Sequence, residues 1–308
     1  PEMKRSLTEL LQKHAFDTVQ VDYYFMMQNV PESLSQPVLL QNIVLDTGLY
    51  ADCAVRARNP LVRLAYRRLA RQCGAWELRG WKRADLNVAI TPELSQQMRQ
   101  LGFRDQIEVQ LPGLDMEYYQ PGDAFEQGKE DLVFVGAMRY PPNVDAMLYF
   151  CREVLPLIRE RRPNIRLWIV GQHPVPEIVA LGKEPNVNVT GFVDDVRPYW
   201  NRGTVAVLPL RIGGGVRLKM LEALAMGKAI VTTESGAEGS SAEPGKEFLQ
   251  ASSSEEMRDQ ILRLLDDGEL RRTLQRNARQ AAVNRYSWEI CGQRFEKMHE
   301  WLLTERTC

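Results

Sequence analysis

The hydrophobic and polar positions of the chain alternate between short apolar runs and longer segments with helical periodicity. Short runs rich in Val, Ile and Leu are typical of strands buried on both faces of a parallel sheet. The segments between them repeat apolar residues every three or four positions, which is typical of amphipathic helices. This alternation predicts an α/β protein built from parallel sheets.

The first half carries the weaker form of this pattern. Strands are predicted at 17–22, 37–42, 86–90 and 107–112, and helices at 6–14 and 61–82. Thr91 is expected to cap a further helix, because Pro92 suits the first helical position and a threonine hydroxyl can accept from the free amides there. The segment 119–130, rich in Gly, Pro and charged residues, is the predicted linker.

The second half carries the clearer pattern. Strands are predicted at 131–136, 165–171, 187–189, 204–210 and 229–232, and helices at 143–161, 218–226, 254–266, 270–285 and 288–303. Glycines follow three of these strands, at 136, 171 and 213–215. Ligands of open parallel sheets bind at the carboxyl ends of strands, so these glycines indicate a binding site.

Three parts are expected along the chain: an N-terminal domain over 1–125, a C-terminal domain over 126–285, and a final helix over 286–308. In that helix Trp288, Phe295, Met298 and Trp301 recur at helical spacing, which predicts a buried stripe. The chain begins without Met and inside a predicted helix, so we expect the N-terminal domain to be incomplete.

Composition narrows the class of protein. The 308 residues are 44% hydrophobic and 26% charged, as in a soluble globular protein, and the net charge of −1 gives no reason to expect nucleic acid as a partner. Five scattered cysteines and three histidines indicate neither a disulfide framework nor a metal site. We expect a cytoplasmic protein that needs no metal and no cofactor.

One stretch combines glycines, cations and a carboxylate. After the strand at 204–210 come Gly213 to Gly215, then Arg217, Lys219 and Glu222 on the following helix. Glycine amides and a helix N-terminus favour an anion, and two cations can neutralise a diphosphate. A carboxylate one turn further can accept ribose hydroxyls. The alternative is an ordinary turn with Lys219 and Glu222 as a surface pair, and the combined spacing favours the ligand site.

The run GGGVRLKMLEALAMGKAIVTTESGAEG, which begins at Gly213, resembles the donor-site signature of retaining family 4 glycosyltransferases, nearest to bacterial exopolysaccharide sugar transferases. Weaker similarity continues at 84–91, 111–121, 134–146, 189–196 and 286–289. The resemblance implies a GT-B fold: two Rossmann-like parallel-sheet domains that face a cleft, with the C-terminal helix crossing back to the first domain.

The resemblance also implies site residues. Glu222 matches the second Glu of the family's Glu-seven-residues-Glu motif, whereas the first falls at Gly214 and is absent. The usual phosphate-binding cations after the first donor-domain strand are missing as well. Arg217 and Lys219 are therefore expected to be the catalytic cations. The donor-binding set implied in this way is Gly136, Arg139, Gly191, Phe192, Val193, Gly213, Gly214, Gly215 and Glu222.

A second departure lies in the first half. Many members of the family have a His-Asn pair at a strand end, where the His contacts the donor sugar. Gln41-Asn42 stands at the matching place. Glutamine can hydrogen-bond a hydroxyl but cannot titrate. The pair is either a donor-sugar contact or an ordinary polar strand end, and the sequence leaves both interpretations open.

The implied activity is transfer of a sugar from a nucleotide diphosphate sugar to a saccharide or lipid-linked acceptor, with retention of configuration. The alternatives are a non-catalytic nucleotide-sugar-binding protein and a sugar-nucleotide epimerase of GT-B architecture. No Gly-x-Gly-x-x-Gly follows a strand, which argues against a nicotinamide-dependent oxidoreductase.

Basic residues crowd the segment 56–83, where Glu77 is almost the only acid and Leu61, Leu64, Leu69 and Trp76 give an apolar side. Such a helix can rest on an anionic membrane surface. The simpler interpretation, which we prefer from the sequence, is a solvated face whose apolar stripe faces the core.

Overall fold

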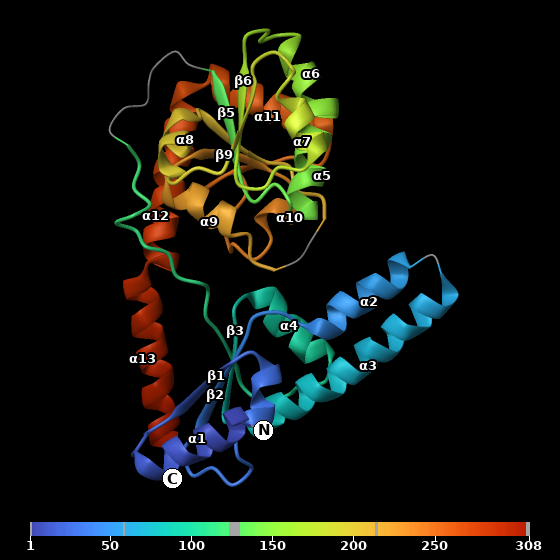
Figure 1. Ribbon diagram of the computed structural model, residues 1–308. Coiled ribbons are helices and arrows are strands. Elements are labelled where there is room, and N and C mark those ends of the chain that lie inside the picture. The colour runs from blue at the N-terminus through green and yellow to red at the C-terminus, as the bar shows by residue number, and fades with distance from the viewer. Residues whose placement is uncertain (1, 58, 123–129, 213–214, 306–308) are drawn as a thin grey trace. The chain divides into compact units, whose positions relative to one another are not determined.

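The computed structural model describes residues 2–57, 59–122, 130–212 and 215–305 (Figure 1). The chain divides into two compact units. Unit 1 comprises residues 1–112 and 291–308, and unit 2 comprises residues 113–290. Each unit is built around its own parallel sheet, as the alternating pattern predicts.

Unit 1 has a four-stranded parallel sheet in the order β1-β2-β3-β4. Its strands are β1 (Val19–Asp22), β2 (Val38–Asn42), β3 (Leu86–Ala89) and β4 (Ile107–Val109). Its helices are α1 (Glu2–Lys13), the 3-10 helix η1 (Tyr24–Asn29), α2 (Asp46–Arg56), α3 (Pro60–Arg83) and α4 (Pro92–Gln100). The predicted cap of α4 is confirmed, since the Thr91 hydroxyl accepts from the Leu94 amide at 3.0 Å.

The last helix, α13 (Trp288–Glu305), belongs to unit 1 from residue 291 onward. Met298 and Leu302 of this helix pack with Leu39, Leu86 and Val88 of the sheet in one buried cluster. Burial of such side chains is worth about 1.5–3 kcal/mol each, enough to hold the helix on the sheet. The C-terminal helix therefore returns to the N-terminal sheet.

Unit 2 has a six-stranded parallel sheet in the order β10-β9-β8-β5-β6-β7. The strands are β5 (Asp131–Val135), β6 (Arg166–Val170), β7 (Val187–Gly191), β8 (Val205–Leu208), β9 (Ala229–Thr232) and β10 (Leu249–Gln250). The strand order reverses between β5 and β8, which pair directly. Loops at such a reversal leave the sheet in opposite directions and open a crevice at the strand ends.

The helices of unit 2 cover both faces of this sheet (Figure 1). They are α5 (Pro141–Tyr149), α6 (Leu155–Arg159), α7 (Pro176–Leu181), α8 (Arg197–Arg202), α9 (Leu218–Ala225), α10 (Glu234–Ala237), α11 (Ser254–Asp266) and α12 (Gly268–Tyr286). The single helix predicted over 143–161 is wrong in its regularity, because a π-helical turn (η2, Phe150–Val154) separates α5 from α6. Pro156 has no amide hydrogen to donate into the preceding turn, which accounts for the irregularity.

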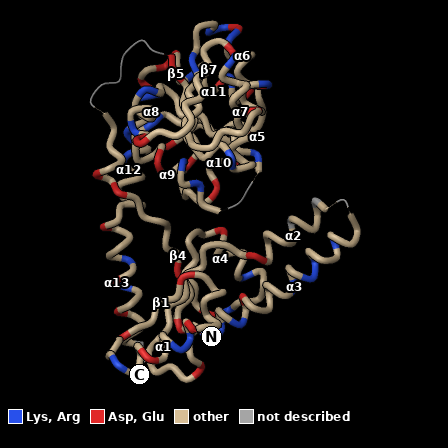
Figure 2. The backbone as a smooth tube through the Cα atoms, in the orientation of Figure 1, with Lys and Arg blue, Asp and Glu red and all other residues tan. Residues whose placement is uncertain are grey.

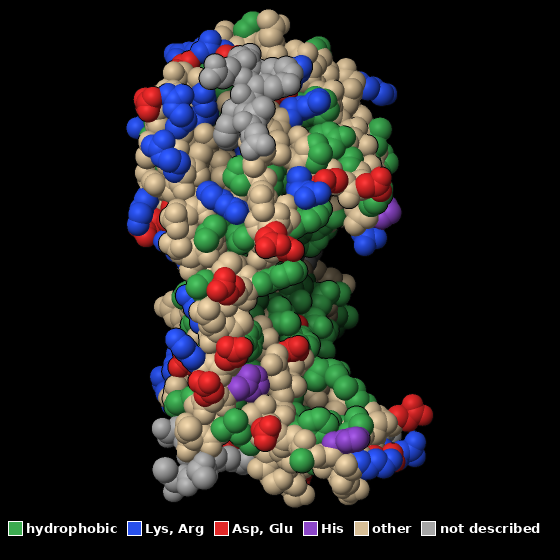
Figure 3. Space-filling view, turned by 90° about the vertical axis from the view of Figure 1, so that its left-hand side faces the viewer, with side chains coloured by type: hydrophobic (Ala, Val, Ile, Leu, Met, Phe, Trp, Pro, Cys, Tyr) green, Lys and Arg blue, Asp and Glu red, His purple; other side chains and the backbone are tan. Residues whose placement is uncertain are grey.

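Charge is unevenly spread despite the net value of −1. Lys and Arg recur along α3 (Figure 2), and they gather over unit 2 on the face shown in Figure 3. No helix among the described residues is both long and apolar enough to cross a bilayer.

Candidate functional site

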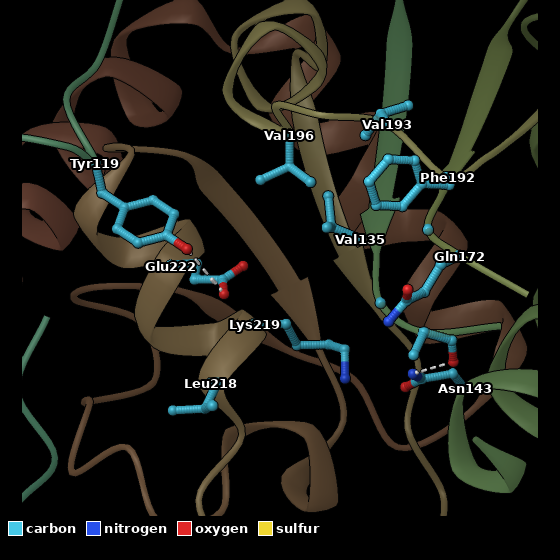
Figure 4. Close-up of a pocket in the computed structure, with 13 residues that line it drawn as sticks. Tyr119, Val135, Asn143, Gln172, Phe192, Val193, Val196, Leu218, Lys219 and Glu222 are labelled. Carbon is cyan, nitrogen blue, oxygen red and sulfur yellow. Dashed lines mark hydrogen bonds between the residues drawn. The ribbon is translucent and has the colours of Figure 1, made fainter. Parts of the chain in front are cut away.

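A hollow of about 390 Å³ lies at the carboxyl ends of the unit 2 strands, beside the reversal between β5 and β8 (Figure 4). This volume is within the range of small-ligand pockets. The walls come from the loop after β5, the loop after β6, the segment after β7, the start of α9 and Tyr119. Segments distant in sequence thus converge where the strand order predicts a ligand.

Two glycines form the floor by close backbone approach. A Cβ atom at Gly171 would lie 1.8 Å from the Gly136 carbonyl oxygen, and Gly171 has φ +151°. A Cβ atom at Gly136 would meet Asn143 Nδ2 at 2.7 Å and Lys219 Cε at 3.1 Å. Only glycine fits both places, and its small size lets Lys219 lie directly against the end of β5.

Lys219 supplies the positive charge of the pocket. It lies in the first turn of α9, and its ammonium is 5.6 Å from the ring centroid of the buried Phe134. Burial, with the nearby charge of Arg217, lowers the pKa of Lys219 to about 8, and Glu222 acts in the opposite direction. The side chain is therefore cationic at neutral pH but incompletely compensated, which favours an anionic ligand.

Glu222 lies on the wall next to Lys219, one turn along α9. Its Oε1 accepts from the Tyr119 hydroxyl at 3.2 Å. Burial raises the pKa of Glu222, while Tyr119 and Lys219 oppose that change. Burial and the neighbouring carboxylate also raise the pKa of Tyr119, so its hydroxyl keeps its proton and donates. The second oxygen of the carboxylate can accept from a ligand hydroxyl.

Tyr119 is a pocket residue that the sequence assigned to the linker. Arg279 of α12 holds its backbone, because one guanidinium nitrogen donates to the carbonyls of Tyr119 at 2.6 Å and Ala225 at 2.7 Å, and the other to Met116 at 3.1 Å. The Arg197 guanidinium stacks 4.0 Å above the Tyr118 ring. These contacts fix the segment before residue 122 to unit 2 and aim Tyr119 at Glu222.

Arg217 lies just before α9 and is 5% exposed. Its guanidinium turns toward α10, donating to the Ser235 carbonyl at 3.0 Å and pairing with Glu238 at 3.4 Å. It does not line the hollow. Its charge still acts on the pocket through its effect on the pKa of Lys219.

The other predicted donor-binding residues divide into three groups. Phe192 and Val193 line the hollow, and the Phe192 ring faces it from the segment after β7 (Figure 4). Arg139 is exposed, and neither it nor Gly191 is part of the described lining. Gly213 and Gly214 lie outside the described residues, whereas Gly215 is described, exposed and has φ +80°.

Asn143 is a polar pocket residue outside the predicted set. It is 3% exposed, and its Nδ2 donates to the Ala137 carbonyl at 2.8 Å. Its Oδ1 is buried and has no hydrogen-bond partner among the described residues. A buried acceptor left without a partner costs about 1–3 kcal/mol, so this oxygen is suited to a ligand donor.

Gln41 and Asn42 lie in unit 1, at the carboxyl end of β2. The Asn42 side chain is 1% exposed and fully engaged: Oδ1 accepts from Trp81 Nε1 at 2.8 Å, and Nδ2 faces the carbonyls of Leu40 and Val88, each at 3.3 Å. Asn42 thus joins two strands and α3. Gln41 is half-buried.

Metal-binding geometry was sought across the described parts of the chain. No group of three or more His, Cys, Asp or Glu side chains there could hold a metal ion. The four described cysteines are free thiols. The chemistry of the hollow therefore rests on Lys219, Glu222, Tyr119, Asn143 and backbone amides.

This arrangement matches known proteins. Residues 129–267 match the Glycosyl transferases group 1 family model. That stretch contains every lining residue of the hollow except Tyr119. A protein of the Klebsiella pneumoniae cps region, described as an uncharacterized 44.6 kDa protein, is 23% identical over 137 residues. The alignment covers 42% of this chain and only 35% of that relative.

The described units also match solved glycosyltransferases. Sucrose-phosphate synthase from Thermosynechococcus elongatus superposes with a TM-score of 0.75 and 16% identity, over 99% of this chain and 78% of that one. Anabaena HepE, solved with UDP and glucose, gives 0.68 and 14%, over 95% and 80%. Staphylococcus aureus TarM gives 0.71 and 13%, over 98% and 58%. At these identities the likeness establishes the fold, which is GT-B.

Proposed function

We propose that this protein is a glycosyltransferase that moves a sugar from a nucleotide diphosphate sugar to a saccharide or lipid-linked acceptor, with retention of configuration. The observation that carries the proposal is the buried Lys219 ammonium beside the Glu222 carboxylate, at the sheet position where GT-B proteins of the group 1 family match this chain. The cation suits the diphosphate and the carboxylate suits the ribose.

The proposed chemistry is electrostatic. Negative charge develops on the departing diphosphate, and Lys219 with the α9 N-terminus would stabilise it there. Arg217 would contribute through its field rather than by direct contact, because its guanidinium is engaged by Ser235 and Glu238. A donor phosphate oxygen would take the acceptor proton, so the scheme needs no protein base, no metal and no further cofactor.

Each remaining pocket residue has a place in this proposal. Phe192 and Val193 would face the nucleobase, and Asn143 Oδ1 would accept from a donor hydroxyl. Gly136 would let the phosphates approach the end of β5. The donor-sugar contact of Gln41, and the amides of Gly213 and Gly214 at the diphosphate, remain predictions. The cps-region relative makes exopolysaccharide synthesis in the cytoplasm the first setting to test.

A panel of nucleotides and nucleotide sugars tests the proposal, starting with UDP-glucose because HepE has been solved with it. Thermal-shift measurements identify the ligand that prefers the folded state. Release of the nucleoside diphosphate then reports transfer, and nuclear magnetic resonance of the product reports its anomeric configuration. Failure of every nucleotide and nucleotide sugar to raise the unfolding midpoint would overturn the proposal.

The same panel separates the alternatives. A nucleotide sugar that stabilises the protein but is never consumed, with any acceptor, would indicate a non-catalytic binding protein. Conversion of one nucleotide sugar into another without acceptor would indicate an epimerase.

A further inference from the structure

The helical hairpin formed by α2 and α3 carries a large share of the exposed apolar side chains. These helices have 11 and 24 residues, yet they hold seven of the 21 large hydrophobic residues that are exposed in the described parts of the chain. The seven are Leu49, Val55, Leu61, Val62, Leu64, Leu69 and Trp76. Two helices that make up a small part of the chain thus hold a third of its described exposed apolar side chains.

The sequence-based preference for a core-facing stripe is therefore wrong for α3. Leu61 is 77% exposed, Leu64 64% and Trp76 51%. Residues with low exposure, such as Ala70 and Glu77, occupy the side of α3 that packs along α2. The hairpin has its own narrow seam, and the apolar residues on the opposite side have no partner within the described part of unit 1.

Cations accompany these apolar residues. Six exposed basic side chains lie on α3: Arg63, Arg67, Arg68, Arg71, Arg79 and Lys82 (Figure 2). Glu77 is the one acid in the α3 sequence, and it is buried and hydrogen-bonded to the Thr47 hydroxyl at 2.5 Å. No ion pair found among the described residues involves the six cations. Their positive charge is therefore uncompensated at the surface.

Apolar and basic residues share the same surface of α3. Val62, Leu69 and Trp76 are spaced by seven and so lie along one flank of the helix. The Arg79 guanidinium lies over the Trp76 ring, 5.6 Å from its centroid. Tryptophan and arginine side by side on an amphipathic helix are typical of the headgroup region of a bilayer, where the ring is half-immersed and the cation meets phosphate.

We propose that the α2–α3 hairpin docks the protein on an anionic membrane, with the six cations on lipid phosphates and the exposed apolar side chains in the interface. The charge favours this occupant over a second copy of the chain, because two such surfaces would repel one another. The leucines and valines favour a lipid over a nucleic acid, which offers no apolar interior. The proposal is independent of the transfer reaction, although it suits an enzyme with a lipid-linked acceptor.

Vesicle flotation of the full chain, without donor or acceptor, tests this proposal. The probes are vesicles of phosphatidylcholine alone and of phosphatidylcholine mixed with phosphatidylglycerol. Binding to the mixed vesicles is expected to exceed binding to neutral vesicles by at least about tenfold and to fall as salt is raised. Equal binding to both compositions, or binding to neither, would refute the electrostatic part or the whole.

Three double variants locate the surface. R67E with R71E removes charge, and L61S with L64S removes apolar contact; each is expected to lower the mixed-vesicle partition coefficient by at least about tenfold. R104E with R161E changes exposed arginines elsewhere by the same charge and is expected to have a much smaller effect. Circular dichroism and the unfolding midpoint must be unchanged in all three, and a variant that unfolds is replaced by R68E with K82E.

Two outcomes contradict the proposal directly. One is a control pair that lowers binding as much as the hairpin pairs, which would mean that net charge alone drives binding. The other is a wild-type dimer in sedimentation analysis that L61S with L64S dissociates, which would make the hairpin a self-association surface. Because nucleotide-sugar binding is measured separately, failure here leaves the proposed transfer intact.

Discussion

Lys219 is held where its charge is costly. Its ammonium is half-buried beside Phe134 and near Arg217, and its pKa is lowered to about 8. A residue kept for stability alone would not be cationic in this position, because burial of an incompletely compensated charge is unfavourable. Its free energy cost is understandable if an anionic ligand completes the site.

Replacement of this lysine should therefore separate function from stability. K219M keeps the length and shape of the side chain but removes the charge. Turnover is expected to fall by at least about 100-fold, as when a transition-state charge loses its main partner. The free energy of unfolding is expected to stay the same or rise by about 1 kcal/mol, because a desolvation cost disappears.

Steady-state kinetics and chemical denaturation measure the two effects. K183M, at an exposed lysine of the same unit, is the matched control and should change neither. A K219M protein with normal turnover, or one that is strongly destabilised, would contradict the assigned role.

The pKa of Lys219 also predicts a pH dependence of donor affinity. An anionic donor binds the protonated lysine more tightly, so affinity is highest below the free-protein pKa of about 8 and decreases as pH rises through it. Between about pH 7 and pH 9 the dissociation constant should increase roughly tenfold. Calorimetric titrations at several pH values measure it, and K219M should lose this dependence while keeping any contribution from the nucleobase.

At the residue scale, the sequence was enough to find Lys219 and Glu222 because both are fixed by one strand-to-helix turn and the helical repeat. Tyr119 could not be found in this way, because its place depends on Arg279, 160 residues further along the chain. Nor could the orientation of Arg217, which depends on α10, or the engagement of Asn42 by Trp81.

At the scale of elements, the crossing of the loops after β5 and β6 builds the floor of the pocket. G171A should be strongly destabilising, because its Cβ would overlap the Gly136 carbonyl at 1.8 Å and its φ is +151°. We expect a loss of about 3 kcal/mol or more in the free energy of unfolding.

Denaturant titration measures this loss. G292A is the control: Gly292 is exposed within α13, a Cβ atom there would meet nothing within 4 Å, and alanine should stabilise by about 0.5–1 kcal/mol. Equal effects of the two substitutions would show that the close approach at the pocket floor is not tight.

Elements were predictable where period and caps agree and obscure where they compete. The strands of both sheets and the helices α9, α11 and α12 follow from apolar periodicity within a few residues. The interruption between α5 and α6 did not, because apolar spacing continues through the turn that Pro156 distorts. The helix α2 was missed because Gly48 and a weak apolar repeat resemble a loop.

At the scale of the whole molecule, the parallel order of both sheets and the return of α13 to unit 1 make the chain a GT-B protein. The group 1 match covers residues 129–267 and thus most of unit 2. The fold was predictable because resemblance was specific around the glycine run. The membrane-facing character of the hairpin was not, because exposure of α3 depends on how narrowly α2 covers it.

The central claim is that a nucleoside diphosphate occupies the hollow at the start of α9. A crystal structure of the complex with the nucleoside diphosphate that binds most tightly tests it most directly. The account predicts a phosphate oxygen within about 3 Å of Lys219 Nζ and ribose hydroxyls on the Glu222 carboxylate. A nucleotide bound elsewhere on the chain, with Lys219 and Glu222 making no contact to it, would contradict the account.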